Sequence, residues 1–254
     1  MWLVQFSRSK SETFKKTLSE TQRGIVGGSS TSIENYPYVS ALLYLSSQAY
    51  VQTCVGTIIN NRAILSAAHC FYGHSASSWR IRVGSSYANS GGTVFTTAQI
   101  IIHPSYTQYS NDNDVAIMHS SAAFTFSNSV RAAGIAGTNY NVADNQALWS
   151  VGWGKASSSG SFSEQLRHFE SRSINLSTCQ SIYVQLAMYL TDNMMCSGWL
   201  NASGNECQGI SGGPLVHNSV IVGIHSWGAQ CQLARYPGIS TRVSAYTSWI
   251  QSNA

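Results

Sequence analysis

The chain has 254 residues, which allows one large all-β unit or two small domains with a well-buried core. Only 9% of the residues are Asp, Glu, Lys or Arg, against about 25% in an average domain, and Ser, Thr, Asn, Gln and Gly supply most of the polarity. The formal charge is +4, and residues 1–24 hold five basic and two acidic side chains. The rest of the chain has no basic run, which argues against nucleic-acid binding.

In chain order, residues 1–24 form a polar, charged segment that we interpret as leader-like or propeptide-like. Its apolar start, residues 2–4, is too short for a secretory signal or a membrane span, so either the true N-terminus is missing or a longer leader has left a remnant. From residue 25 onwards, short β-like runs alternate with turns, as is typical of barrels and sandwiches. Examples of the predicted strands are Tyr38–Leu45, Gly56–Ile59, Ala63–Ser66, Trp79–Val83, Thr93–Ile102, Val115–Met118, Gln146–Val151, Pro214–Val216 and Val220–Ser226.

The end of the chain has a different pattern. Val243, Tyr246, Trp249 and Ile250 lie at the spacing i, i+3, i+6 and i+7, which places them on one face of a helix. This spacing predicts a C-terminal helix.

Three short motifs contain residue types that serve nucleophilic catalysis, namely His69, Asp114 and Ser211. Each motif alone is weak, because a lone His is usually structural, a lone Asp is usually a turn residue and Gly-x-Ser-Gly-Gly is often only a loop. In this order and at these separations, the motifs resemble those of the chymotrypsin/trypsin family, and residues 61–65 and 191–200 look most like moth midgut trypsins. The motifs are residues 65–70, 111–116 and 207–214, and the resemblance also covers residues 152–154, 226–228 and 236–238.

The resemblance runs from Ile25 to the C-terminal helix. It implies an all-β fold of two orthogonal six-stranded antiparallel barrels followed by that helix. We expect one peptidase domain over residues 25–254, with the first barrel at about 25–130, the second at about 131–242 and the helix at about 243–253.

The resemblance also carries over the family's mechanism. His69 would take the proton of the Ser211 hydroxyl and later protonate the leaving amine, while Asp114 would hold the imidazole in the right tautomer and stabilise the imidazolium. Backbone N–H groups of Gly209 and Ser211 would form the oxyanion hole, where one donor contributes ~10²–10³ in rate. We expect no cofactor and no metal, and residues 71–111 contain no Asp or Glu for the family's calcium loop.

The expected specificity pocket departs from the trypsin pattern at its base. Asn205 stands six residues before the nucleophile, where trypsins have an Asp that pairs with substrate Arg or Lys, and Glu206 follows it. Asn offers hydrogen bonds but no charge, so the preference for basic side chains should weaken unless Glu206 supplies the carboxylate. The other expected substrate-binding residues are Ser226, Trp227, Gly228 and Gly238, of which the two glycines leave room for a large side chain.

The six cysteines allow 15 pairings by count alone and contain no Cys-x-x-Cys pair, which argues against a zinc site. The family resemblance implies the disulfides Cys54–Cys70, Cys179–Cys196 and Cys207–Cys231. Three disulfides would indicate an oxidising compartment, so we expect a secreted, extracellular protein. Two Asn-x-Ser sequences, at Asn175 and Asn201, are glycan acceptors if the chain is secreted.

Three further departures from the family pattern bear on activity or packing. Ile210 stands where the family has an Asp, whose carboxylate receives the N-terminal ammonium that activation frees. Gly24 separates Arg23 from Ile25, so a cut after Arg23 gives an end one residue too long for the usual socket. Both changes remove the same ion pair. Val55 replaces a family glycine, for which we expect only a local change in packing.

We therefore expect a digestive serine endopeptidase that acts on protein or peptide substrates through an acyl-enzyme intermediate. We also expect protein protease inhibitors as partners. The protein is expected to be a monomer and to bind neither nucleic acid nor a membrane. The alternative is a catalytically weak or inactive homologue with a binding or regulatory role, which Ile210 and Gly24 favour. A structural protein associated with carbohydrate or chitin has no motif in its support. Beyond residue 24, eight of the nine basic residues are arginine. Arginine keeps its charge at alkaline pH, so this excess fits a protein that works there, and drift in composition explains it equally well.

Overall fold

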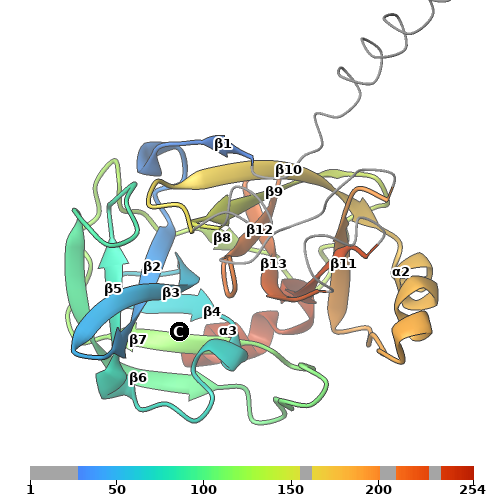
Figure 1. Cartoon of the computed structure of the whole chain (residues 1–254), viewed down its shortest axis with the longest axis horizontal. Coiled ribbons are helices and arrows are strands. Elements are labelled where there is room, and N and C mark those ends of the chain that lie inside the picture. The colour runs from blue at the N-terminus through green and yellow to red at the C-terminus, as the bar shows by residue number, and fades with distance from the viewer. Residues whose placement is uncertain (1–27, 155–161, 201–209, 229–235) are drawn as a thin grey trace, which may run out of the picture.

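The computed structural model describes residues 28–154, 162–200, 210–228 and 236–254, and its strands close into two barrels that lie side by side (Figure 1). The first barrel is antiparallel, with the strand order β2-β3-β4-β7-β6-β5, and β5 pairs back onto β2. Its strands are β2 Val39–Ser46, β3 Ala49–Ile58, β4 Ala63–Ser66, β5 Trp79–Val83, β6 Thr93–Ile102 and β7 Ala116–Ser120.

The second barrel has the strand order β9-β10-β11-β14-β13-β12 and closes because β9 pairs antiparallel with both β10 and β12. Two short strands join it from outside, β1 Ser29–Ser30 on β10 and β8 Gly134–Ile135 on β13. The predicted pair of six-stranded antiparallel barrels is thus confirmed, while the boundary near residue 130 stays a prediction. The barrel strands are β9 Ala147–Gly152, β10 Arg167–Ile174, β11 Met194–Gly198, β12 Pro214–His217, β13 Val220–Trp227 and β14 Gly238–Arg242.

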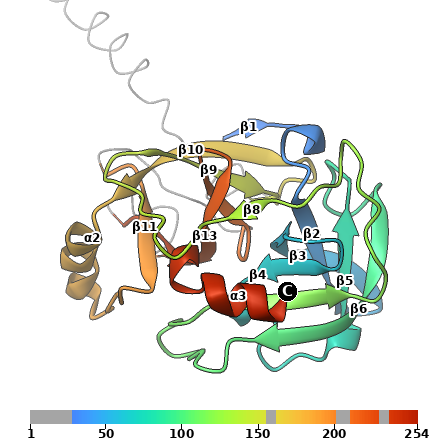
Figure 2. The ribbon, with the colours of Figure 1, turned by 180° about the vertical axis from the view of Figure 1, so that it is seen from behind.

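Helices lie at the edges of the barrels. Figure 1 shows α2, Leu176–Tyr183, at the outer end of the second barrel. The predicted C-terminal helix is confirmed as α3, Thr247–Asn253, which runs back onto the first barrel, where His119 bonds to the Asn253 carbonyl at 2.8 Å (Figure 2). The other helices within the described residues are short 3₁₀ turns at Ile33–Asn35, Ala68–Cys70, Ala76–Ser78, Val184–Leu186 and Val243–Ala245.

The interior of the first barrel is filled by the apolar side chains of its strands. In β5, Trp79, Ile81 and Val83 are buried and alternate with half-buried arginines, as the two-residue period of a strand requires. Trp79 also meets Phe71 edge to face, with ring centroids 4.9 Å apart. Among the described residues, no helix has the length and apolar character needed to cross a membrane.

Candidate active site

Strand pairing brings His69 and Asp114 together. β4 ends at Ser66, which pairs with Ala116 at the start of β7. The chain runs from β4 into the 3₁₀ turn that carries His69, and Asp114 lies two residues before β7. The two side chains therefore leave neighbouring ends of paired strands and meet beside the second barrel.

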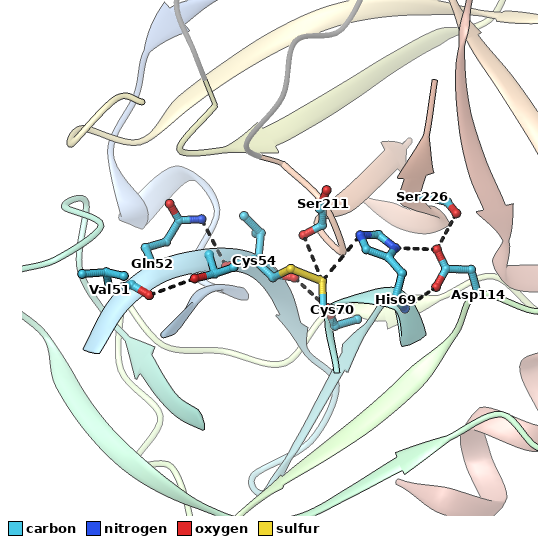
Figure 3. The surroundings of a disulfide bond; sticks show 11 residues. Val51, Gln52, Cys54, His69, Cys70, Asp114, Ser211 and Ser226 are labelled. Atoms are coloured by element: carbon cyan, nitrogen blue, oxygen red, sulfur yellow. Dashed lines mark hydrogen bonds and ion pairs between the residues drawn. A yellow bond between two sulfur atoms is a disulfide. The ribbon is translucent and has the colours of Figure 1, made fainter. Parts of the chain in front are cut away.

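Asp114 is fully buried, and its carboxylate accepts three hydrogen bonds (Figure 3). Oδ1 accepts the backbone N–H of His69 at 2.8 Å, while Oδ2 accepts His69 Nδ1 at 2.7 Å and the hydroxyl of Ser226. Because an ionised carboxylate can only accept hydrogen bonds, the ring proton of His69 sits on Nδ1. Nε2 is left as the basic nitrogen of the site.

Ser211 lies beside the Cys54–Cys70 disulfide, across from His69 (Figure 3). Cys70 Sγ is 3.8 Å from His69 Nε2 and 3.9 Å from the Ser211 carbonyl oxygen. Both Ser211 and His69 are described, and no hydrogen bond joins the serine hydroxyl to the imidazole. In free enzymes this bond is often long and tightens only when substrate is bound.

The backbone that follows Ser211 is held by its neighbours. The Gly212 N–H donates to the carbonyl of His225 at 2.8 Å, and the His225 N–H donates to the carbonyl of Gly213 at 2.9 Å. Gly212 has a φ of +77°, and a β-carbon on it would lie 2.1 Å from Ser66 Oγ. Glycine is therefore required at this turn.

Four of the predicted pocket residues lie at the adjoining ends of β13 and β14. A β-carbon on Gly228 would lie 3.6 Å from Gly238 Cα and 3.8 Å from the Tyr183 hydroxyl, so a larger residue there would narrow the space between the strands. The β13–β14 register shifts just before Trp227, and this bulge directs Ser226 out of the ladder toward the buried carboxylate.

Two of the three predicted disulfides are confirmed, Cys54–Cys70 beside His69 and Cys179–Cys196 between α2 and β11. The sulfur atoms of Cys54 and Cys70 lie within 4.8 Å of a His69 ring nitrogen, but the disulfide leaves no thiolate to bind a metal there. The remaining predicted residues lie outside the described part of the chain, so their roles stay predictions: Gly24, Asn205, Glu206, Cys207, Gly209 and Cys231.

A family model described as Trypsin matches residues 25–250. The chain belongs to the trypsin family. Trypsin CFT-1 of Choristoneura fumiferana is 55% identical to it over 239 residues, which cover 93% of each protein. Trypsin, alkaline C, of Manduca sexta is 50% identical over 232 residues, or 91% of each protein, and Achelase-1 of Lonomia achelous is 48% identical over 235 residues, or 91% of this chain and 100% of the relative. The chain is accordingly a serine endopeptidase of the trypsin type.

No sequence motif could have predicted two polar neighbours of this trypsin-family site. The Thr241 hydroxyl, on β14, donates to the Asp114 backbone carbonyl at 2.8 Å. Burial, and to a smaller extent the charge of Asp114, raises the pKa of Tyr106 to about 12. Both interactions depend on how the barrels fold around the aspartate, and a single sequence does not reveal this.

Proposed function

We propose that the protein hydrolyses peptide bonds with His69, Asp114 and Ser211 as its catalytic residues. The observation that carries this proposal is the His69–Asp114 pair. One buried carboxylate bonds to both the ring and the backbone of a single histidine, whose Nε2 is directed toward the serine segment. A histidine held in this tautomer can take a proton from a serine hydroxyl.

In the proposed mechanism, Ser211 Oγ attacks the substrate carbonyl while its proton passes to His69 Nε2. The imidazolium, stabilised by Asp114, gives this proton to the leaving amine, and the carbon–nitrogen bond breaks to leave an acyl ester on Ser211. Water then attacks the ester with the same histidine as base. The backbone N–H groups of Gly209 and Ser211 are the proposed donors to the oxyanion.

We propose protein substrates, a digestive role and an extracellular location. Two disulfides support an oxidising compartment. Two of the moth relatives bear the name trypsin, and the Manduca sexta protein is named alkaline, which agrees with the arginine-rich set of basic residues. Protein protease inhibitors are proposed ligands of the same cleft, and the active form is proposed to be a monomer. The bonding of Asp114 favours this enzyme over an inactive homologue.

Labelling with a fluorophosphonate probe tests the catalytic assignment, because the probe reacts with an activated serine and assumes no cleavage preference. We expect one adduct per chain, on the peptide that contains Ser211. Labelling should be lost in Ser211→Ala and His69→Ala, while circular dichroism stays native. A natively folded wild-type chain that the probe does not label would contradict the proposal.

A further inference from the structure

Ile210, which directly precedes the proposed nucleophile, and Val55 from the first barrel lie against the same glycine, Gly152. The Ile210 side chain is only 6% exposed. A β-carbon on Gly152 would lie 2.9 Å from Ile210 Cγ2 and 3.1 Å from Val55 Cγ2, so both methyl groups lie over the same glycine at the end of β9. A β-carbon on Gly213 would lie 3.1 Å from Val55 Cγ1. The Val55 side chain thus lies beside Gly213, after Ser211, and shares the surface of Gly152 with Ile210, before Ser211.

The backbone of Val55 holds the same segment. Its N–H donates to the Ser211 carbonyl at 2.9 Å, and its own carbonyl accepts the Ser66 hydroxyl at 2.8 Å. The Gly213 N–H donates to the Ile210 carbonyl at 2.7 Å, which closes the turn that carries the serine. One residue of β3 therefore fixes the serine segment through both a hydrogen bond and apolar contacts.

We propose that Ile210 and Val55 form an apolar clasp that positions Ser211 for catalysis. This proposal rests on the proposed function. A carboxylate in the place of Ile210 would need a cation beside it, whereas isoleucine needs only the apolar surface that Val55 and Gly152 provide. The two departures from the family pattern thus meet in space, and the clasp supplies by packing what an ion pair to the N-terminus would supply by charge.

The first test is the rate of peptide hydrolysis by Ile210→Ala, Val55→Ala and the double variant. Each single change should lower kcat by about tenfold or more, because the serine shifts, with little change in KM, because Gly228 and Gly238 are untouched. The double variant should lose less than the product of the two single effects, since both side chains hold the same serine segment. Ile210→Val should retain most of the activity.

The control is Ile81→Ala, which removes an equally buried side chain in β5. It should lower the thermal midpoint and leave kcat per active site unchanged. Hydrogen exchange provides a readout that needs no catalysis, because the amides of Gly212 and Gly213 should exchange faster in Ile210→Ala. A wild-type kcat in Ile210→Ala, or unchanged exchange at both glycines, overturns the clasp. If the two amides exchange faster in Ile210→Ala but the probe never labels the wild-type chain, the proposed function is overturned and the clasp is not.

A separate observation concerns Asn175, which begins an Asn-Leu-Ser sequence at the start of α2. The residue is exposed, and its Oδ1 accepts the backbone N–H of Ser177 at 2.9 Å and the Ser177 hydroxyl at 2.6 Å. Within the described residues, its Nδ2 donates no hydrogen bond. A modification of Nδ2 would therefore leave the helix cap intact.

Next to this side chain is a hollow of about 490 Å³, whose lining includes Asn175, Arg172 and Trp199. We infer that Asn175 carries an N-linked glycan, with room for its first sugar in this hollow. In the transfer, Asn175 Nδ2 loses a proton and bonds to the sugar C1, while the bond between C1 and the pyrophosphate of a lipid-linked oligosaccharide donor breaks.

The test is mass spectrometry of the chain secreted from insect cells behind a secretion signal. We expect a glycan on Asn175 that an amidase removes with conversion of the residue to Asp. The glycan should be lost in Asn175→Gln and in Ser177→Ala but retained in Ser177→Thr, and Asn201→Gln serves as the matched control. An unmodified Asn175 in the secreted wild-type chain would overturn the inference.

Discussion

Asp114 Oδ2 lies 2.7 Å from His69 Nδ1, and the antiparallel pairing of β4 with β7 places both residues. The second barrel completes the arrangement through Ser226, which donates to the same carboxylate oxygen. The aspartate thus bonds to residues of both barrels, and its position depends on how the barrels pack against each other.

Asp114→Asn tests the role of this pair. Asparagine presents an amide donor as well as an acceptor, so the imidazole can adopt the tautomer that cannot take the Ser211 proton. We expect kcat to fall by about 10⁴-fold, the size of the effect known for this substitution in the trypsin family, with little change in KM. Ser226→Ala is the matched control, because it removes one donor but keeps the carboxylate, and it should cost far less. An Asp114→Asn enzyme within tenfold of wild type would contradict the assigned role.

Substrate preference tests the predicted pocket base. With Asn205 at that base, as the sequence predicts, a buried substrate guanidinium would lack an ion pair, and an unpaired buried charge is costly. We therefore expect kcat/KM for matched Arg, Lys, Tyr, Phe and Leu substrates to differ less than in a trypsin with Asp at this position. A strong preference for Arg that disappears in Glu206→Gln would instead show that the carboxylate has moved one position along the chain.

Cleavage after Arg23 tests whether the N-terminal switch is lost. Since Ile210 cannot pair with an ammonium, cutting should change the labelling rate of Ser211 little. Ile210→Asp combined with deletion of Gly24 should make labelling depend on the cut, and each change alone should do much less, because an ion pair needs both partners. A large rise on cleavage of the unmodified chain would show that Ile210 has not removed the switch.

One buried and two half-buried tyrosines set an alkaline limit to stability. Burial raises the pKa of Tyr38, Tyr106 and Tyr246 above the ordinary value of about 10, in the case of Tyr106 to about 12. Above pH 10 the folded chain binds more protons than the unfolded chain. The stabilisation is therefore complete below about pH 10 and is lost as the pH rises through the folded pKa values.

Tyr38→Phe removes one of these groups, and no hydrogen bond of its hydroxyl is present among the described residues. We expect the variant to unfold at a higher alkaline pH than wild type, as measured by circular dichroism between pH 8 and 12. The control is Tyr109→Phe, which alters a fully exposed side chain and should leave the midpoint unchanged. Equal alkaline midpoints for wild type and Tyr38→Phe would refute the expectation.

The predicted strands cover at least part of every strand of the first barrel, but of the second barrel only β9, β12 and β13, and not β10, β11 or β14. The predicted run Trp79–Val83 coincides with β5, in which the buried Trp79, Ile81 and Val83 alternate with arginines. β10 was not predicted, because its buried positions are Ser171 and Ser173, which carry no apolar signal. Their burial follows from strand pairing on both sides, which is a property of the folded barrel.

The candidate site was likewise predicted only in part. His69, Asp114 and Ser211 were identified from motifs and their order, and the pairing of β4 with β7 explains why two of them meet. The approach of Ile210 and Val55 to the same glycine, Gly152, was not predicted, because the two residues lie far apart in the sequence and come together only when the barrels pack. Local patterns thus identify which residues are chemically suited to the site, whereas packing determines their neighbours.

The central claim is that Ser211 is the nucleophile of a working peptidase. The most direct measurement is kcat/KM on a peptide amide substrate for purified wild type and Ser211→Ala, with active sites counted by the fluorophosphonate probe. Wild type should turn over substrate in proportion to its labelled sites, and Ser211→Ala should lose activity by about 10⁴-fold or more with its fold intact. Peptidase activity that persists in pure Ser211→Ala, or a fully labelled wild-type chain that cleaves no peptide bond, would contradict the account.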